Sequence, residues 1–275
     1  MPNRRWSDWP RAFGDKLNST GGAVGLIGLG VGAVALVTPP LWVPLLVTSA
    51  GVTVAGALGW TALKSLPAKL EKPDNLLGKK LNVSSLKSID PPVHRLGLVG
   101  AGYTGKSTLL DHVRQYPAST DRTETVYAVI VTLPTTPISY LALLDGAGGE
   151  FVQQFRVADN SSLLTILLDH NVSDSSPDID QQRLKQHDDF LSQLNSYIRD
   201  RHEDKFENIH FLLNKEDLWA GSTKKTELLA WLNSHIATWR NSGLAKTVTA
   251  SHHSNRHAAS ITNFIQHVIK TTQRR

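Results

Sequence analysis

The sequence contains no cysteine, which excludes disulfide bonds and thiolate zinc sites. It is also low in charge: charged residues make up 19% of the chain, and the formal net charge is only +5. No basic cluster is interleaved with aromatic residues, as is typical of nucleic-acid binding. We therefore expect no nucleic-acid partner. A modest basic excess does suit a protein that lies beside anionic lipid.

Charge is missing altogether from residues 17–63, which contain no Asp, Glu, Lys, Arg or His. Pro39 and Pro40 interrupt this stretch, and proline ends a helix because it lacks the backbone N–H. The pattern predicts two helices, over residues 18–37 and 41–63. Since roughly 20 apolar residues span a bilayer, we predict a transmembrane helical hairpin over residues 17–63, preceded by an interfacial segment over residues 1–16.

Cationic residues flank the hairpin on both sides, and none lies in its turn. By the positive-inside tendency, both termini and the domain that follows belong in the cytoplasm. Three alternatives stay open: a hairpin that dips into one leaflet, a buried helical pair and a cleaved signal peptide. Two G-x-x-x-G spacings in the first helix let backbones approach closely. This contact is either internal to the hairpin or a route to self-association.

Residues 64–93 carry four prolines and several lysines, and this composition predicts a linker. An apolar run over residues 93–99 follows, and it leads into a G-x-x-x-x-G-K-S sequence. In a strand–loop–helix setting this is a phosphate-binding loop, because its backbone N–H groups and the helix N-terminus face the phosphates. The predicted nucleotide contacts are Gly100, Gly102, Tyr103, Thr104, Gly105, Lys106, Ser107 and Thr108, with Ser107 also a Mg²⁺ ligand.

The choice of base is predicted from Asn214-Lys215-Glu216-Asp217, which follows the apolar run 209–213. A carboxylate at Asp217 can accept two hydrogen bonds from the ring N–H and the amine of guanine. Adenine offers no such pair of donors and would leave the charge unpaired. Asn214 is expected to brace the loops, and the stem of Lys215 to cover the base.

With these two motifs the chain resembles the translation-factor and Ras-like class of P-loop GTPases, over residues 94–275. The resemblance implies an α/β Ras-like G domain with a mainly parallel sheet flanked by helices on both faces, and GTP or GDP with Mg²⁺ as cofactors. It implies that Asp145, in the D-x-x-G run 145–148, holds Mg²⁺ through water and that Gly148 senses the γ-phosphate. It also implies guanine contacts at Ala250 and Ser251, in a weak match to the S-A-K motif.

The resemblance also implies a switch threonine that ligates Mg²⁺. We favour Thr125, with Thr123 and Thr120 as alternatives. Gly149 stands where Ras-like proteins place a water-orienting glutamine, so hydrolysis is expected to be slow. Arg122, three residues before Thr125, is a candidate built-in arginine finger, and a solvated loop arginine is the alternative.

Together these features predict a membrane-anchored GTPase that hydrolyses GTP slowly and switches a protein effector, or a membrane assembly, at the cytoplasmic face. An activating protein is a further expected partner. The β subunit of the signal-recognition-particle receptor offers a partial analogy in architecture only. Two alternatives are a GTP-dependent docking platform with little hydrolysis and a membrane-perturbing effector that GTP assembles.

Overall fold

The computed structural model describes residues 70–114, 126–146, 151–201 and 206–273. Within them, seven strands form one sheet in the order β1-β3-β4-β2-β5-β6-β7. The strands are β1 (Lys80–Asn82), β2 (His94–Val99), β3 (Tyr127–Leu133), β4 (Ser139–Asp145), β5 (Leu163–Leu168), β6 (Phe206–Leu213) and β7 (Ala245–His252).

The five strands β4, β2, β5, β6 and β7 run parallel, while β3 pairs antiparallel with β4, and β1 antiparallel with β3. The helices and 3-10 helices are η2 (Pro73–Leu76), η3 (Val83–Ser88), α3 (Lys106–Val113), α4 (Phe151–Asp159), α5 (Gln181–Arg201), α6 (Glu216–Trp219), α7 (Lys225–Asn241) and α8 (Ala258–Thr272). The mainly parallel sheet flanked by helices agrees with the α/β part of the predicted fold class.

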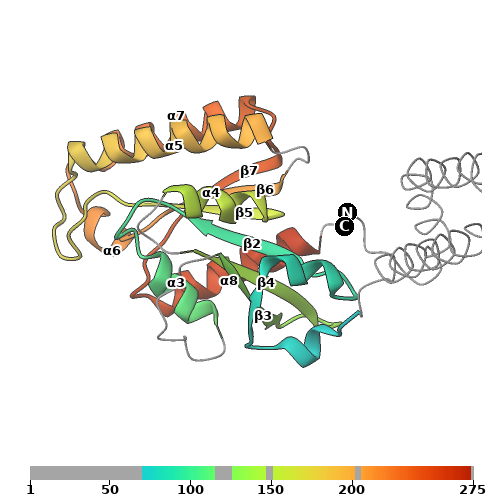
Figure 1. Ribbon diagram of the computed structural model, residues 1–275. Coiled ribbons are helices and arrows are strands. Elements are labelled where there is room, and N and C mark those ends of the chain that lie inside the picture. Colours follow the sequence, from blue (N-terminus) through green and yellow to red (C-terminus); the bar gives the residue numbers. More distant parts are fainter. Residues whose placement is uncertain (1–69, 115–125, 147–150, 202–205, 274–275) are drawn as a thin grey trace, which may run out of the picture. The chain divides into compact units, whose positions relative to one another are not determined.

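Helices cover both faces of the sheet: α3 and α8 lie on one face, and α4, α5 and α7 on the other (Figure 1). Strand β5 shows how the sequence builds this arrangement. All six of its residues are buried, as expected of a central parallel strand. Successive side chains point to opposite faces, so Leu163 and Leu167 pack with α3 and α8, whereas Leu164 and Ile166 pack with the helices opposite.

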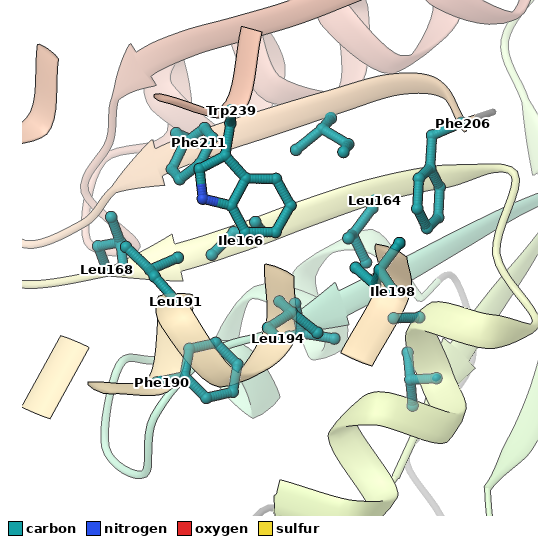
Figure 2. Packing of buried hydrophobic residues seen from close by; sticks show 14 of the residues in the cluster. Leu164, Ile166, Leu168, Phe190, Leu191, Leu194, Ile198, Phe206, Phe211 and Trp239 are labelled. Carbon is teal, nitrogen blue, oxygen red and sulfur yellow. The ribbon is translucent and has the colours of Figure 1, made fainter. Parts of the chain in front are cut away.

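The larger core lies under α5 and α7. Helix α5 begins where the Asp180 carboxylate accepts a hydrogen bond from Gln182 N at 2.9 Å, which satisfies one of the free N–H groups of its first turn. Buried residues then recur along one stripe of the helix, with Leu184, Leu191, Leu194 and Ile198 among them. Figure 2 shows this stripe packed against β5 and β6, beside Trp239 from α7.

From Glu71 onward, the described part of the predicted linker belongs to the compact domain. Strand β1 adds to the edge of the sheet beside β3, and Leu76, Leu86 and Ile89 are buried in the larger core. The compact unit therefore begins at Glu71 rather than at residue 94. Proline and lysine content suggested an open chain, but the apolar residues between them are sufficient to dock this segment.

The predicted hairpin (17–63) and the interfacial segment (1–16) lie outside the described residues. Among the helices of the described ranges, none combines the length and hydrophobicity needed to cross a bilayer.

Strand β2 is the point where the chain changes direction across the sheet. It pairs with β4 on one side and with β5 on the other. In open parallel sheets, ligands bind beyond the carboxyl ends of the strands at such a switch point. The fold therefore places the loop after β2, which carries the predicted phosphate contacts, at the position where a ligand is expected.

Candidate functional site

The loop of residues 100–105 joins β2 to the N-terminus of α3, as the motif predicted. Two of its glycines are required by space. A Cβ on Gly100 would lie 2.3 Å from the carbonyl oxygen of Leu167, and one on Gly105, where φ is +87°, would lie 2.5 Å from the amide nitrogens of Asn214 and Asn255. A side chain at either position would displace neighbouring atoms, so these glycines allow the loop its tight path.

Lys106 is the first residue of α3, directly after this loop. Its ammonium donates to the carbonyl oxygens of Gly100 at 2.7 Å and Ala101 at 2.6 Å. Burial, reinforced by the positive charge of Arg183, lowers the pKa of Lys106 from 10.5 to about 8. The ammonium is therefore mostly charged at neutral pH, and it is held beside the loop that the motif assigns to phosphates.

One pocket of about 410 Å³ opens between this loop and the loops that follow β6 and β7. Its volume lies in the range typical of small-molecule sites. The residues that line it are Gly102, Tyr103, Gly105, Lys106, Ser107, Thr108, Asp174, Asn214, Lys215, Asp217, Leu218, Ser254, Asn255 and Arg256. Most of the predicted phosphate contacts thus meet Asn214, Lys215 and Asp217 in one cavity, although the two groups are more than 100 residues apart in the chain.

Asn214 joins the two loops, as predicted. Its side-chain amide donates to the carbonyl oxygen of Thr104 at 2.9 Å, and its backbone carbonyl oxygen accepts from the Trp219 indole at 2.9 Å. Lys215 has a left-handed backbone with φ of 60°. Its ammonium binds the Asn171 carbonyl oxygen at 2.8 Å and the Asp174 carboxylate at 2.9 Å, so this side chain ties the loop after β5 to the pocket.

The Asp217 carboxylate accepts hydrogen bonds from the Ser254 hydroxyl at 2.6 Å and from Arg256 at 3.2 Å. Burial alone would raise the pKa of Asp217, but the hydrogen bond from Ser254 and the charge of Arg256 outweigh it. The pKa therefore lies below its usual value of 3.8. The side chain is an oriented, ionised carboxylate at the pocket wall, which is the form that can accept two N–H donors.

The predicted contacts at Ala250 and Ser251 are wrong in position. Strand β7 continues to His252, because Ala250 and Ser251 pair with Phe211 and Leu212 of β6. Neither residue lines the pocket; Ser251 instead contacts the ring of His210 at 2.9 Å. The pocket is lined by Ser254, Asn255 and Arg256, in the loop beyond the strand. The sequence Ser254-Asn255-Arg256 carried a signal that we missed, a serine two residues before a basic side chain.

A buried charged cluster beneath the pocket also escaped the sequence analysis. Asp169 directly follows β5. Its carboxylate accepts from Arg183 Nε at 2.6 Å, contacts His187 at 2.8 Å and pairs with Lys215 at 3.0 Å. Arg183 also donates to the Gly102 carbonyl oxygen at 2.6 Å. One carboxylate therefore connects the phosphate loop, through Arg183, to Lys215 at the start of α6, the helix that carries Asp217. The available signal was an aspartate at the end of an apolar run, as at Asp145.

The predicted metal ligands are only partly brought together. Ser107 is exposed and lines the pocket. Asp145 ends β4, but its carboxylate accepts from Arg114 and from the Tyr127 hydroxyl, each at 2.9 Å. It is absent from the pocket lining. A Mg²⁺ site that uses Asp145 therefore does not fit this arrangement of the described residues.

Thr125, Arg122 and Gly148 lie outside the described residues, as do Thr120, Thr123 and Gly149. Their proposed roles stay predictions. A further contact to the phosphate loop comes from Gln154 of α4, a buried side chain whose amide oxygen accepts from Gly100 N at 3.2 Å.

No protein-family model matches the sequence, and no curated protein matches it. Many solved structures are similar to part of this chain, and two of them serve as examples. The structure of the mammalian SRP receptor has a TM-score of 0.44 and 16% identity, and the match covers 65% of this chain and 100% of that chain. Translation elongation factor SelB from Methanococcus maripaludis, in complex with the GTP analogue GPPNHP, has a TM-score of 0.44 and 17% identity. The match covers 66% of this chain and 34% of SelB. At these values the similarity carries no conclusion about activity, and the case for a function rests on the pocket.

Proposed function

We propose that this chain binds guanine nucleotides and hydrolyses GTP slowly. The observation that carries the proposal is the shared pocket, which combines a phosphate-binding loop with an oriented carboxylate at Asp217. The loop N–H groups, the N-terminus of α3 and the Lys106 ammonium supply positive potential at one end of the pocket. The carboxylate supplies the acceptor for N–H donors at the other.

Guanine fits this carboxylate and adenine does not. Guanine presents a ring N–H and an exocyclic amine on one edge, and both can donate to Asp217. In this conformation Arg256 already contacts one carboxylate oxygen, so guanine would share or replace that contact. Adenine would leave the charge with no donor pair, and a site built around a hydrogen bond discriminates strongly against a ligand that lacks it.

A titration with GTP, GDP and ATP tests the proposal. We expect GTP and GDP to bind about 100-fold or more tightly than ATP, since the site gains a charged hydrogen-bond pair only with guanine. Asp217→Asn should shift the preference toward xanthine nucleotides, because it inverts the donor and acceptor pattern. Lys106→Ala should abolish tight binding to all of them. Equal affinity for ATP and GTP in the unmodified chain would contradict the assignment.

Hydrolysis is proposed on the resemblance. A slow rate is proposed because Gly149 has no side chain to orient water. The single-turnover rate should be on the order of 10⁻⁴ per second or below without a partner. If Arg122 acts as a built-in finger, Arg122→Ala should lower the single-turnover rate and leave GTP affinity unchanged. If no hydrolysis is measured, the docking platform becomes the better description. A GTP-dependent increase in oligomer size in detergent would instead favour the membrane-perturbing effector.

Attachment to a membrane is the remaining part of the proposal, and the charge-free residues 17–63 support it. The hairpin would hold the nucleotide-binding domain at the cytoplasmic face, where nucleotide state controls an effector. The full chain should stay with membranes through carbonate extraction, and reporters at both termini should lie on the cytoplasmic side. A reporter on the opposite side would overturn the proposed topology.

A further inference from the structure

The carboxylate of Asp145 is held by two side chains that the sequence analysis did not connect to it. The Arg114 guanidinium donates to Asp145 Oδ2 at 2.9 Å, and the Tyr127 hydroxyl donates to the same oxygen at 2.9 Å. The Arg114 side chain is only 7% exposed, and that of Asp145 is 25% exposed. This is a largely desolvated ion pair, in which each charge interacts more strongly than it would in water.

Both the backbone and the side chain of Arg114 make contacts that position it beside Asp145. It follows the last residue of α3, where its backbone N–H donates to the Leu110 carbonyl oxygen at 2.7 Å. A second carboxylate, Asp111, lies 3.7 Å from its other terminal nitrogen. The Tyr127 ring contacts Arg114 as well, with the guanidinium carbon 5.6 Å from the ring centroid. The geometry of the guanidinium is therefore fixed by several partners.

The ion pair lies next to the phosphate loop. Strands β2 and β4 are parallel neighbours, with Gly97 opposite Leu144. Asp145 therefore lies at the carboxyl end of β4, close to where β2 leads into the loop. The electrostatics of Lys106 also show that Asp145 is close to this loop. Burial and Arg183 lower the pKa of Lys106, whereas the negative charge of Asp145 raises it.

A bare carboxylate at this place would repel nucleotide phosphates unless a cation compensated it. Arg114 supplies a cation from the chain itself. A divalent ion that approached Asp145 would also have to compete with a largely buried pair, and breaking such a pair leaves a charge uncompensated. Both effects reduce what a metal ion can add to nucleotide binding.

We propose that Arg114 substitutes for part of the charge compensation of Mg²⁺ at Asp145, so that guanine nucleotides bind this chain with little dependence on Mg²⁺. The inference rests on the proposed function and specifies how strongly nucleotide binding at that site depends on Mg²⁺. It corrects the expectation that Asp145 is available as a metal ligand. Arg114 acts here as a positioning and charge-compensating residue, because it contacts Asp145 and does not line the pocket.

Dissociation constants for a fluorescent GDP analogue test the proposal, measured on the full chain in detergent with Mg²⁺ and with EDTA. For the unmodified chain, the two constants should agree within about tenfold, a small coupling between metal and nucleotide. In Arg114→Met, binding in EDTA should weaken by about tenfold or more while binding in Mg²⁺ changes little. Arg114→Lys should restore part of the EDTA binding, because it keeps the charge. Arg156→Met, which alters an exposed arginine of α4, is the matched control.

Asp145→Asn should change the affinity in EDTA in the opposite direction to Arg114→Met. It removes the negative charge and leaves Arg114 in place, so nucleotide should bind in EDTA at least as tightly as in the unmodified chain. This variant and Tyr127→Phe keep the inference testable even if Arg114→Met fails to fold, which thermal unfolding would reveal.

Two outcomes are distinguishable. If the analogue does not bind in either buffer, the proposed function itself fails. If the unmodified chain binds tightly in Mg²⁺, loses about 100-fold or more in EDTA and is unaffected by Arg114→Met, the function stands and this inference is wrong. The same conclusion would follow if Asp145→Asn weakened binding in EDTA.

Discussion

Arg183 shows how one side chain can serve two loops. Its guanidinium donates to Asp169 at 2.6 Å and to the Gly102 carbonyl oxygen at 2.6 Å, and the side chain is 3% exposed. Burial alone would raise the pKa of Asp169, but hydrogen bonds from His187 and Arg183 lower it below its usual value. The carboxylate is therefore charged, and its cations are needed to keep it buried.

Arg183→Met should accordingly destabilise the domain by about 3 kcal/mol, because removing one partner leaves a buried charge poorly compensated. Nucleotide affinity should fall as well, since Gly102 loses the donor that holds its carbonyl group. Denaturant unfolding and GDP titration measure the two effects separately.

Arg183→Lys keeps the charge but not the forked geometry that reaches both acceptors. It should recover part of the stability and less of the affinity. Arg199→Met, an exposed position on the same helix, should change neither. Unchanged GDP affinity in both Arg183 variants would show that the contact with Gly102 has no role in binding.

Among the elements, β6, β7 and α8 meet around buried histidines. The ring nitrogens of His210 contact Thr249 at 2.8 Å and Ser251 at 2.9 Å. The His267 ring from α8 stacks on it, with the ring centroids 4.1 Å apart. Burial, reinforced by the charges of His267 and His253, lowers the pKa of His210 from 6.5 to about 3. The folded chain therefore holds His210 neutral over a wide acidic range.

This predicts a loss of stability on acidification. Between pH 6.5 and about 3, the unfolded chain binds a proton at His210 and the folded chain does not. The free energy of unfolding should fall as pH falls through that window, by about 1.4 kcal/mol per pH unit from this group. Urea unfolding at pH 7 and pH 5 measures the slope.

His210→Gln should reduce that slope, but not remove it, because His170, His187 and His253 also have lowered pKa values. Gln266→Ala, which replaces an exposed and uncharged side chain of α8, should leave the slope unchanged. An equal slope in His210→Gln and the unmodified chain would refute the role assigned to His210.

At the scale of the whole molecule, the domain boundary has a measurable consequence. A chain of residues 71–275 retains β1 and the buried side chains Leu76, Leu86 and Ile89. A chain of residues 94–275 loses them and leaves the edge of β3 unpaired. Each buried apolar side chain contributes about 1.5–3 kcal/mol, and an unpaired strand edge favours aggregation.

We therefore expect the shorter chain to unfold at a lower temperature and to aggregate more readily. Calorimetry and light scattering on both chains test this. Equal melting temperatures would show that residues 71–93 add nothing to the fold.

Local sequence determined much of this protein. Glycine spacing, an adjacent lysine and flanking apolar runs were enough to predict the phosphate loop at residues 100–107. The apolar run over residues 93–99 was enough to predict the strand that leads into this loop, which the structure shows as β2 (His94–Val99). Asn214 and Asp217 were recognised because their chemistry depends on residues that are neighbours in the chain. The charge-free residues 17–63 predict a hairpin in the same local way, and that prediction is still to be tested.

Only the tertiary structure decided which distant groups meet. Ser254 rather than Ser251 contacts Asp217, because pairing with β6 extends β7 to His252. Arg114, directly after α3, contacts Asp145 at the end of β4, although the two residues are 31 positions apart. Asp169 pairs with Arg183 from α5 and with Lys215 from the segment after β6. Burial and charge at these contacts depend on packing across the sheet, and no local pattern in the sequence encodes that packing.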